Sequence, residues 1–379
     1  MKRFVKRYFI DAMGAMALGL FASLLIGTIF GTVGKYTGLE FLDTIANYAK
    51  AATGMAIGVA IAYKLQCDPL VIFSAAAVGA MSNAMGAVIS QSGGIVKWAA
   101  TANVGEGNIF YSAGPAGAFF AVIIACEIGR LVSKKTKVDI LVTPVVTLLV
   151  GFAASWLLCP IVAFVMYYLG VFIATATTFQ PLLMGIVVSV VVGVILTLPI
   201  SSAAICAMIF SASAYEAAVL SGTEEGFLLA GGAAVAGCCA QMVGFAVISF
   251  RENGWGGVMS QGIGTSMLQM PNIIKRPQIW IAPTLASAIT GPMAVCLFKL
   301  RMYGAAINSG MGTCGLLGPI GMILGWIDPE NGYTGELGAL QWIGLVLVCF
   351  VLPAVLSFVF NKILRKLGWV RDGDMKLPE

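Results

Sequence analysis

The chain has 379 residues, of which 59% are hydrophobic and only 10% are charged, whereas soluble domains carry about 25% charged residues. With a mean hydropathy of +0.94, this composition excludes a soluble enzyme and predicts an integral membrane protein. The net charge of +5 comes from basic clusters at the ends of apolar segments, which indicates contact with an anionic lipid leaflet and no nucleic-acid partner.

The first predicted element is a membrane helix over residues 12–33. Four basic residues between Met1 and Arg7 precede this apolar run, an arrangement that superficially resembles a signal peptide. The run is longer than the apolar core of about 7–15 residues that signal peptides use. We therefore interpret it as the first span and expect the N-terminus to be cytoplasmic.

The remaining apolar segments predict an all-α, polytopic helical membrane protein with about ten transmembrane helices plus re-entrant or broken elements. The stretch from Ile140 to Tyr215 contains 76 consecutive residues without Lys, Arg, Asp or Glu, which is enough for three crossings of roughly 20 residues each. Segments 48–64 and 304–326, and the stretch from Gly254 to Ile274, are predicted to be short, re-entrant or interfacial. The apolar segments are 12–33, 48–64, 69–90, 111–132, 140–168, 181–199, 203–220, 227–250, 279–298, 304–326 and 339–362.

We expect one membrane-embedded permease domain over residues 1–379, ending in a short cytoplasmic tail at 363–379. With ten crossings and both termini in the cytoplasm, 17 of the 22 basic residues fall on the cytoplasmic side, in agreement with the positive-inside rule. Lys299 and Arg301 fall outside, so this topology fits least well in the region 277–335.

The residue types exclude several kinds of chemistry. Histidine is absent, which excludes a His-based catalytic triad, a His-ligated metal and a phosphohistidine on this chain. The nine cysteines lie mostly in apolar segments without a C-x-x-C motif, so we interpret them as buried apolar side chains rather than disulfides or metal ligands. The glycine-rich stretches lack the P-loop form. We expect no catalytic residues, no metal and no cofactor.

Ionisable residues within the apolar segments are few. Polar groups in hydrocarbon are costly unless they face a partner or a water-filled cavity, so each one is a candidate for function. Glu216, near the end of the span from Ala203, is compatible with function and equally with interfacial exposure. Glu127 lies three residues before Arg130, a spacing that predicts a local ion pair on a helix.

Polar, helix-breaking clusters give more information than the single charges. Pro199 frees a backbone carbonyl beside two serines, 201 and 202, which can either satisfy that carbonyl or bind a solute. In the passage 254–272, amides and hydroxyls suit a neutral polyol such as a sugar, because both groups donate and accept hydrogen bonds. The alternative is an interfacial loop that is hydrogen-bonded to itself. The candidate substrate-binding residues are Asn83, Gln91, Glu106, Ser201, Ser202, Glu216, Gln241, Gln261, Ser266, Gln269, Asn272 and Asn308.

Three motifs carry a resemblance to a known family: Leu-Pro-Ile-Ser-Ser at 198–202, Gly-Cys-Cys-Ala-Gln at 237–241 and Gln-Gly-Ile-Gly-Thr-Ser-Met-Leu-Gln-Met-Pro-Asn at 261–272. In these motifs the chain resembles the stand-alone enzyme IIC-type membrane proteins of the bacterial phosphotransferase system, in the branch that includes the perfringolysin O regulator proteins. The resemblance extends over nearly the whole chain. It implies a sugar permease (EIIC) of the bacterial plasma membrane that works as a homodimer with separate IIA and IIB phosphocarrier proteins.

The chain has neither a IIA-type histidine nor a soluble IIB-type cysteine domain, which fits a IIC-only subunit. Any enzymatic role would then be that of the translocating subunit of a sugar phosphotransferase. The chain departs from glucose-type permeases, whose sites use an acidic residue and sometimes a histidine in the membrane. Two alternatives stay open. One is a membrane sensor or regulator that docks a partner through the basic loop from Arg130 to Lys137 and the C-terminal tail. The other is a transporter of a non-sugar solute without phosphorylation coupling.

Overall fold

The computed structural model describes residues 6–90, 94–99, 108–198, 202–327 and 338–377. The chain divides into two compact units. Unit 1 comprises Met1–Gly170 and Ser211–Leu220, and unit 2 comprises Val171–Phe210 and Ser221–Glu379. The regular secondary structure of the described residues is helical apart from a small three-stranded sheet.

Seven helices in the described part of the chain are long and apolar enough to cross a membrane. Glu40–Ala51 and Thr53–Lys64 form a further pair bent by 52°, where the sequence predicted a short or re-entrant element at 48–64. Shorter apolar helices lie at Pro69–Ala84, Pro181–Thr197 and Cys314–Ile327. These features confirm a polytopic helical membrane protein. The seven long helices are Lys6–Gly31, Gly114–Val132, Asp139–Phe179, Ser202–Leu220, Glu224–Ile248, Pro277–Leu297 and Ala339–Lys366.

Unit 1 begins with one nearly continuous helix in which α-helical and π-helical turns alternate. Its later helices include α8, which has 41 residues and is therefore roughly 60 Å long at 1.5 Å per residue. The last nine residues of α8, 171–179, belong to unit 2. The elements are η1 (Lys6–Ala12), α2 (Met13–Leu20), η2 (Phe21–Leu25), α3 (Ile26–Thr37), α4 (Glu40–Ala51), α5 (Thr53–Lys64), α6 (Pro69–Ala84), β1 (Gly86–Ser90), β2 (Ile95–Ala99), β3 (Asn108–Ser112), α7 (Gly114–Val132), α8 (Asp139–Phe179) and α11 (Ala212–Leu220).

The small sheet was not predicted from the sequence. Strand β1 lies in its centre and pairs antiparallel with β2 and with β3. Val88 and Ile89 of β1 are buried and prolong the apolar run of α6, so hydropathy alone continued that segment as a helix to residue 90. An ideal Cβ atom on Gly86 would lie 1.8 Å from the carbonyl oxygen of Tyr111, so β1 and β3 can approach this closely only at a glycine.

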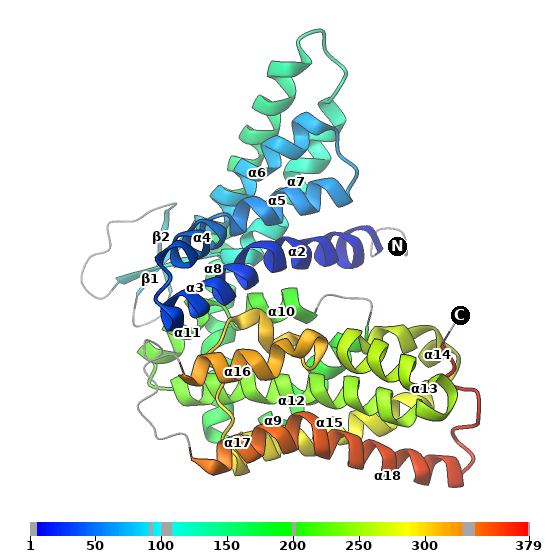
Figure 1. Ribbon diagram of the computed structural model, residues 1–379. Helices are drawn as coiled ribbons and strands as arrows, with labels where there is room; N and C mark the ends of the chain where they lie inside the picture. The colour runs from blue at the N-terminus through cyan, green and yellow to red at the C-terminus, as the bar shows by residue number, and fades with distance from the viewer. Residues whose placement is uncertain (1–5, 91–93, 100–107, 199–201, 328–337, 378–379) are drawn as a thin grey trace. The chain divides into compact units, whose positions relative to one another are not determined.

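Unit 2 is built around α12. An 18-residue apolar stretch of this helix is 89% buried, whereas the corresponding stretch of the span Ala339–Lys366 is 33% buried. Helix α12 packs against α9, α15 and α18 (Figure 1), so it is enclosed by protein whereas the last span exposes most of its surface. The elements are α9 (Pro181–Thr197), α10 (Ser202–Ile209), α12 (Glu224–Ile248), α13 (Phe250–Met259), η3 (Ser260–Gly264), η4 (Ser266–Gln269), α14 (Met270–Lys275), η5 (Pro277–Trp280), α15 (Ile281–Pro292), η6 (Met293–Leu297), η7 (Ala306–Gly310), η8 (Cys314–Leu316), α16 (Leu317–Ile327), α17 (Ala339–Val346), η10 (Leu347–Val351) and α18 (Leu352–Lys366).

Two irregular segments lie against α12. The first runs through α13, η3 and η4, and Gly254 with a φ of 58° breaks its first helix. The second contains η7 and η8, and the two segments touch where η3 meets η8. Both lie in regions where the sequence predicted short, re-entrant or interfacial elements, 254–274 and 304–326.

Small residues allow the helices around α12 to approach one another closely. An ideal Cβ on Gly237 of α12 would lie 1.9 Å from the backbone carbonyl oxygen of Ser189 on α9. Ser189 in turn donates a hydrogen bond from its hydroxyl to the carbonyl oxygen of Ser287 on α15, at 2.8 Å. Three helices therefore meet at one level, and glycine at 237 is the condition for that contact.

We expect Gly237→Ala to lower the unfolding temperature of the purified protein by several degrees, because overpacking a close contact costs about 1–3 kcal/mol. The matched control is Gly256→Ala on α13, where an added Cβ meets no atom within 4 Å. Alanine is the better helix former, so this control should leave the unfolding temperature unchanged or raise it. Equal melting of the two variants would contradict the close-contact interpretation.

Candidate functional site

Gln241 forms the centre of a buried polar cluster in unit 2. Its side chain is fully buried on α12, one helical turn after Gly237. The amide oxygen accepts a hydrogen bond from the indole N–H of Trp280 at 3.0 Å and a longer one from the Thr197 hydroxyl at 3.4 Å. The amide nitrogen donates to the hydroxyls of Thr284, at 3.3 Å, and Ser287, at 3.4 Å. Both ends of the amide are therefore satisfied by protein groups.

Ser266 extends this cluster into the first irregular segment. Its hydroxyl lies 2.9 Å from the hydroxyl of Thr197, and both side chains are fully buried. Thr197 is the last residue of α9, so one hydroxyl pair joins the end of that helix to η4. We call Thr197, Gln241, Ser266, Trp280, Thr284 and Ser287 the Gln241 cluster.

A second polar group lies on η7, beside the middle of α12. Asn308 and Ser309 are 4% and 1% exposed. The thiol of Cys238 on α12 faces the Ser309 carbonyl oxygen at 3.9 Å, and a Cβ added to Gly231 would lie 3.4 Å from the Ser309 hydroxyl. The pair thus stands at the level of residues 231–238, close to the midpoint of a helix that spans 224–248.

The side chains of this pair differ from the Gln241 cluster in one respect. The amide oxygen of Asn308 and the hydroxyl oxygen of Ser309 are buried and have no hydrogen-bond partner among the described residues. Nearby, the hydroxyl of Ser202 donates to the carbonyl oxygen of Gly310 at 2.7 Å. We call Asn308 and Ser309 the orphan pair.

The chemistry available at these two places is neutral. Amides and hydroxyls, with an indole at one side, can bind a ligand rich in hydroxyl groups but cannot balance an inorganic charge. Within the described residues, no group of three or more His, Cys, Asp or Glu side chains is placed to hold a metal ion.

The structure brings Gln261, Gln269 and Asn272 together, at a place remote from the orphan pair along the chain. The Gln269 amide nitrogen donates to the Gln261 oxygen at 2.9 Å and to the backbone carbonyl of Met375 at 3.0 Å. Asn272 donates to the Gln269 oxygen and to the carbonyl of Lys376, each at 2.9 Å. These amides are therefore engaged with each other and with the C-terminal tail.

Two residues of α13 complete this arrangement. The Glu252 carboxylate accepts the backbone N–H of Met375 at 2.7 Å and of Gly373 at 3.2 Å, and it pairs with Arg365 at 2.8 Å. Asn253 donates to the Met375 carbonyl and accepts from the N–H of Leu377, each at 2.8 Å. We call Glu252, Asn253, Gln261, Gln269 and Asn272 the tail clasp, because together they hold residues 373–377.

Two further predicted residues lie in unit 1. Asn83 is half-buried on α6, and a Cβ atom added to Gly54 of α5 would lie 2.9 Å from the Cβ of Asn83. Glu216 is exposed on α11. Gln91, Glu106 and Ser201 fall outside the described residues.

The basic loop of the regulator alternative is also in unit 1. Arg130 pairs with Glu127 at 3.0 Å, which confirms the predicted local ion pair, and Arg7 pairs with the same carboxylate at 2.8 Å. Lys134 pairs with Asp68. The hydrogen bond from Lys134 holds the pKa of the Asp68 carboxyl below its ordinary value. Two of the four basic residues of the loop, Arg130 and Lys134, are thus engaged in ion pairs.

Sequence reasoning missed Trp280, Thr284 and Ser287, all of which contact Gln241. Their spacing of four and then three residues places them on one face of a helix. That face of the span Pro277–Leu297 is polar in an otherwise apolar segment, and this pattern would have found them.

The geometry can be compared with known proteins. A family model described as "Phosphotransferase system, EIIC" matches residues 10–377, a range that contains the Gln241 cluster, the orphan pair and the tail clasp. No curated protein and no solved structure matches the chain.

We expect Glu252→Ala to release the C-terminal tail, because it removes the acceptor of two backbone N–H groups and of Arg365. Hydrogen bonds to charged groups contribute about 1.5–3 kcal/mol each, so trypsin should cleave after Arg371 about tenfold faster or more. Mass spectrometry of the fragment that begins at Asp372 measures the rate. Glu225→Ala, which breaks an ion pair with Arg301 at a carboxylate 55% exposed, is the control. Equal cleavage of Glu252→Ala and the wild type would show that the clasp does not hold the tail.

Proposed function

Because the chain belongs to the phosphotransferase-system EIIC family, we propose that it carries a sugar across the bacterial plasma membrane as the translocating subunit of such a system. A component of this family is a membrane-integral permease for a solute. The finer assignment, a sugar as the solute, rests on the chemistry of the side chains described above.

The observation that carries the proposal is the orphan pair. A buried polar atom without a partner costs about 1–3 kcal/mol and is rare in native proteins. Hydroxyl groups of a solute could donate to the Asn308 amide oxygen and accept from the Ser309 hydroxyl. Sugars offer several such hydroxyls and no charge, which fits the neutral surroundings.

The position of the pair supports the same reading. Substrate sites of transporters lie near the bilayer midplane, where irregular backbone interrupts the helices. The orphan pair lies on such a segment beside the middle of α12. We infer that the Gln241 cluster holds α9, η4, α12 and α15 around this place, since its amide is already satisfied by protein groups.

Further partners follow from the family resemblance. Histidine is absent from these 379 residues, and the resemblance implies phosphocarriers of the IIA and IIB kind, so we infer separate IIA and IIB proteins as partners. They would meet the cytoplasmic face, where the positive-inside rule places both termini. We also infer that the transporting form is a homodimer, as the family resemblance implies.

The sharpest test replaces Asn308 with leucine, which has nearly the same shape and no polar atoms. Removing an unpartnered polar group from a buried site should leave the unfolding temperature unchanged or raise it, whereas loss of a substrate ligand should lower uptake at least tenfold. Uptake of a panel of labelled sugars into proteoliposomes or cells, with the IIA and IIB proteins supplied, measures the second effect.

Ser357→Ala is a matched control, because the Ser357 hydroxyl on α18 is also buried without a partner among the described residues but packs against Gly244 of α12, away from the orphan pair. Its uptake should equal that of the wild type. Wild-type uptake by Asn308→Leu would remove this pair from the site. Failure of the wild-type protein to bind or carry any sugar in the panel would favour the regulator or a non-sugar solute.

A further inference from the structure

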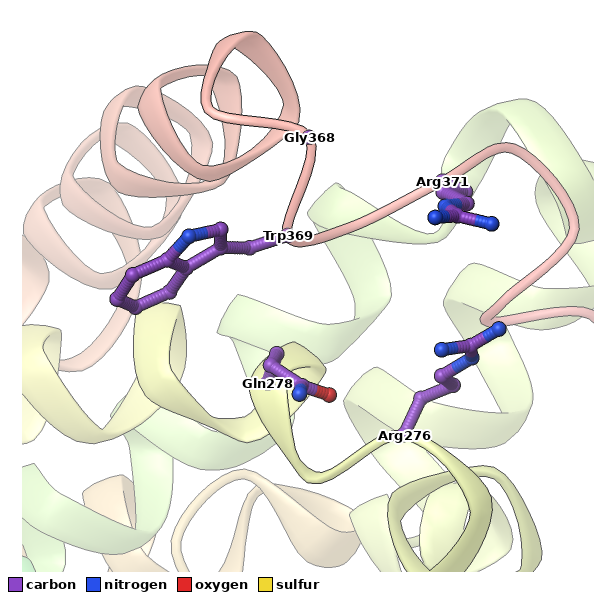
Figure 2. A pocket seen from close by; sticks show the side chains of 5 residues that line it. All are labelled: Arg276, Gln278, Gly368, Trp369 and Arg371. Carbon is purple, nitrogen blue, oxygen red and sulfur yellow. The ribbon is translucent and has the colours of Figure 1, made fainter.

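A pocket of about 320 Å³ lies at one end of unit 2, between the start of the span Pro277–Leu297 and the residues that follow α18. It is lined by Arg276, Gln278, Gly368, Trp369 and Arg371. Figure 2 shows the two guanidinium groups on one side of the pocket, the indole ring of Trp369 on the other, and the Gln278 amide between them. None of these residues belongs to the Gln241 cluster, the orphan pair or the tail clasp.

The walls of the pocket are fixed by buried neighbours. Ile279, Leu364 and Val370 are 0%, 6% and 2% exposed and belong to one hydrophobic cluster. Ile279 and Val370 are adjacent in sequence to lining residues, and the Leu364 carbonyl oxygen accepts the backbone N–H of Trp369 at 3.0 Å. The tail clasp holds residues 373–377, just after Arg371. The lining segment 368–371 is therefore anchored by α18 on one side and by the tail clasp on the other.

The charges around the pocket leave a positive excess. Arg276 lies 3.7 Å from the Asp374 carboxylate, and the same carboxylate accepts the backbone N–H of Arg371 at 2.8 Å. Asp372 is engaged elsewhere, in an ion pair with Arg365. The pocket is therefore lined by two guanidinium groups, with one carboxylate 3.7 Å from that of Arg276, and guanidinium groups match the oxygens of a phosphate group.

Gln278 indicates that the ligand also has a hydrogen-bond donor. Its amide oxygen is buried and has no hydrogen-bond partner among the described residues. An acceptor in this state calls for a ligand that donates a hydrogen bond. The deprotonated oxygens of a phosphate ester cannot do so, but a hydroxyl group carried on the same ligand can.

The pocket also lies beside the ends of two candidate membrane spans. Trp369 follows the candidate span Ala339–Lys366 by three residues, and Gln278 is the second residue of the candidate span Pro277–Leu297. Trp369 is 55% exposed, and tryptophan is enriched at this boundary between hydrocarbon and water. Basic pockets between spans at this depth are suited to phosphate-bearing head groups.

We propose that the pocket between Arg276, Gln278, Trp369 and Arg371 binds a phosphate ester that carries a free hydroxyl group. The two arginines hold the phosphate, and the Gln278 oxygen accepts the hydroxyl proton. The ester is either the head group of an anionic glycerol phospholipid or a soluble phosphate ester that reaches the same surface from water.

The lipid source is tested with full-length protein in nanodiscs of phosphatidylcholine that contain either phosphatidylglycerol or phosphatidylmethanol. These two lipids have the same charge, but only the first has free hydroxyls. Native mass spectrometry counts the lipids retained on the protein. We expect retention of phosphatidylglycerol to exceed that of phosphatidylmethanol by severalfold, and Gln278→Leu to abolish this preference.

The soluble source is tested by calorimetry of the detergent-purified protein with glycerol 3-phosphate, methyl phosphate and inorganic phosphate. Binding of glycerol 3-phosphate without retention of phosphatidylglycerol assigns the site to a soluble ester, and the reverse assigns it to lipid. For whichever source binds, Arg276→Gln and Arg371→Gln should each weaken binding about tenfold or more.

Two further variants separate binding from folding. Lys366→Gln removes a positive charge at the exposed end of α18, outside the pocket, and should bind as the wild type does. Asp374→Asn removes the competing negative charge while keeping an oxygen for the Arg371 N–H, so it should tighten binding. A variant that merely damaged the fold could not do this.

The proposal is overturned if neither source binds, or if Arg276→Gln and Arg371→Gln bind no more weakly than Lys366→Gln. It is also overturned if phosphatidylmethanol and methyl phosphate bind as well as their hydroxyl-bearing counterparts. Because none of these measurements involves uptake, their outcome is independent of the proposed transport function.

Discussion

Polar groups inside a membrane need partners within the protein, because hydrocarbon supplies none. In the described part of unit 2 this requirement explains where regular helix can stop. At the breaks, side chains take over the hydrogen bonds that helical backbone would have made: Ser202 donates to the Gly310 carbonyl, and Thr313 donates to the Gly262 carbonyl. The irregular segments are therefore placed against α12 and against each other, where such partners exist.

The polar contacts depend in turn on how closely the helices approach. Gly237 lets α9 lie against α12, and the hydroxyl of Ser287 on α15 donates to the Gly237 carbonyl at 3.3 Å. One turn further along α12, Gln241 can then reach α9 and α15 at once. Larger side chains at this crossing would separate the helices and put the hydroxyls of Thr197 and Thr284 beyond hydrogen-bond distance. Small residues at this crossing thus allow the polar network to form, because they let the helices approach within hydrogen-bond distance.

Hydropathy was sufficient to predict a helical membrane protein, and the regions 254–274 and 304–326, predicted to be short, re-entrant or interfacial, do contain irregular segments. It could not predict the sheet, because buried Val88 and Ile89 are equally apolar in a strand and in a helix. Nor could it predict the partners of Gln261, Gln269 and Asn272. Gln269 and Asn272 bond to backbone carbonyls of the tail that lie 106 and 104 residues away in the chain, and such contacts leave no local pattern. Trp280, Thr284 and Ser287 did have a local pattern, a polar helix face.

The amides that looked alike in sequence differ in what surrounds them. Those of the tail clasp and Gln241 have protein partners, whereas the Asn308 oxygen has none among the described residues, and this difference separates structural amides from a candidate ligand. The two satisfied groups are not independent of each other. Element η4 supplies Gln269 to the tail clasp and, three residues earlier, Ser266 to the Gln241 cluster. The single short helix η4 therefore contacts both the tail and the end of α9. The tail is therefore linked, through η4, to the polar cluster inside unit 2.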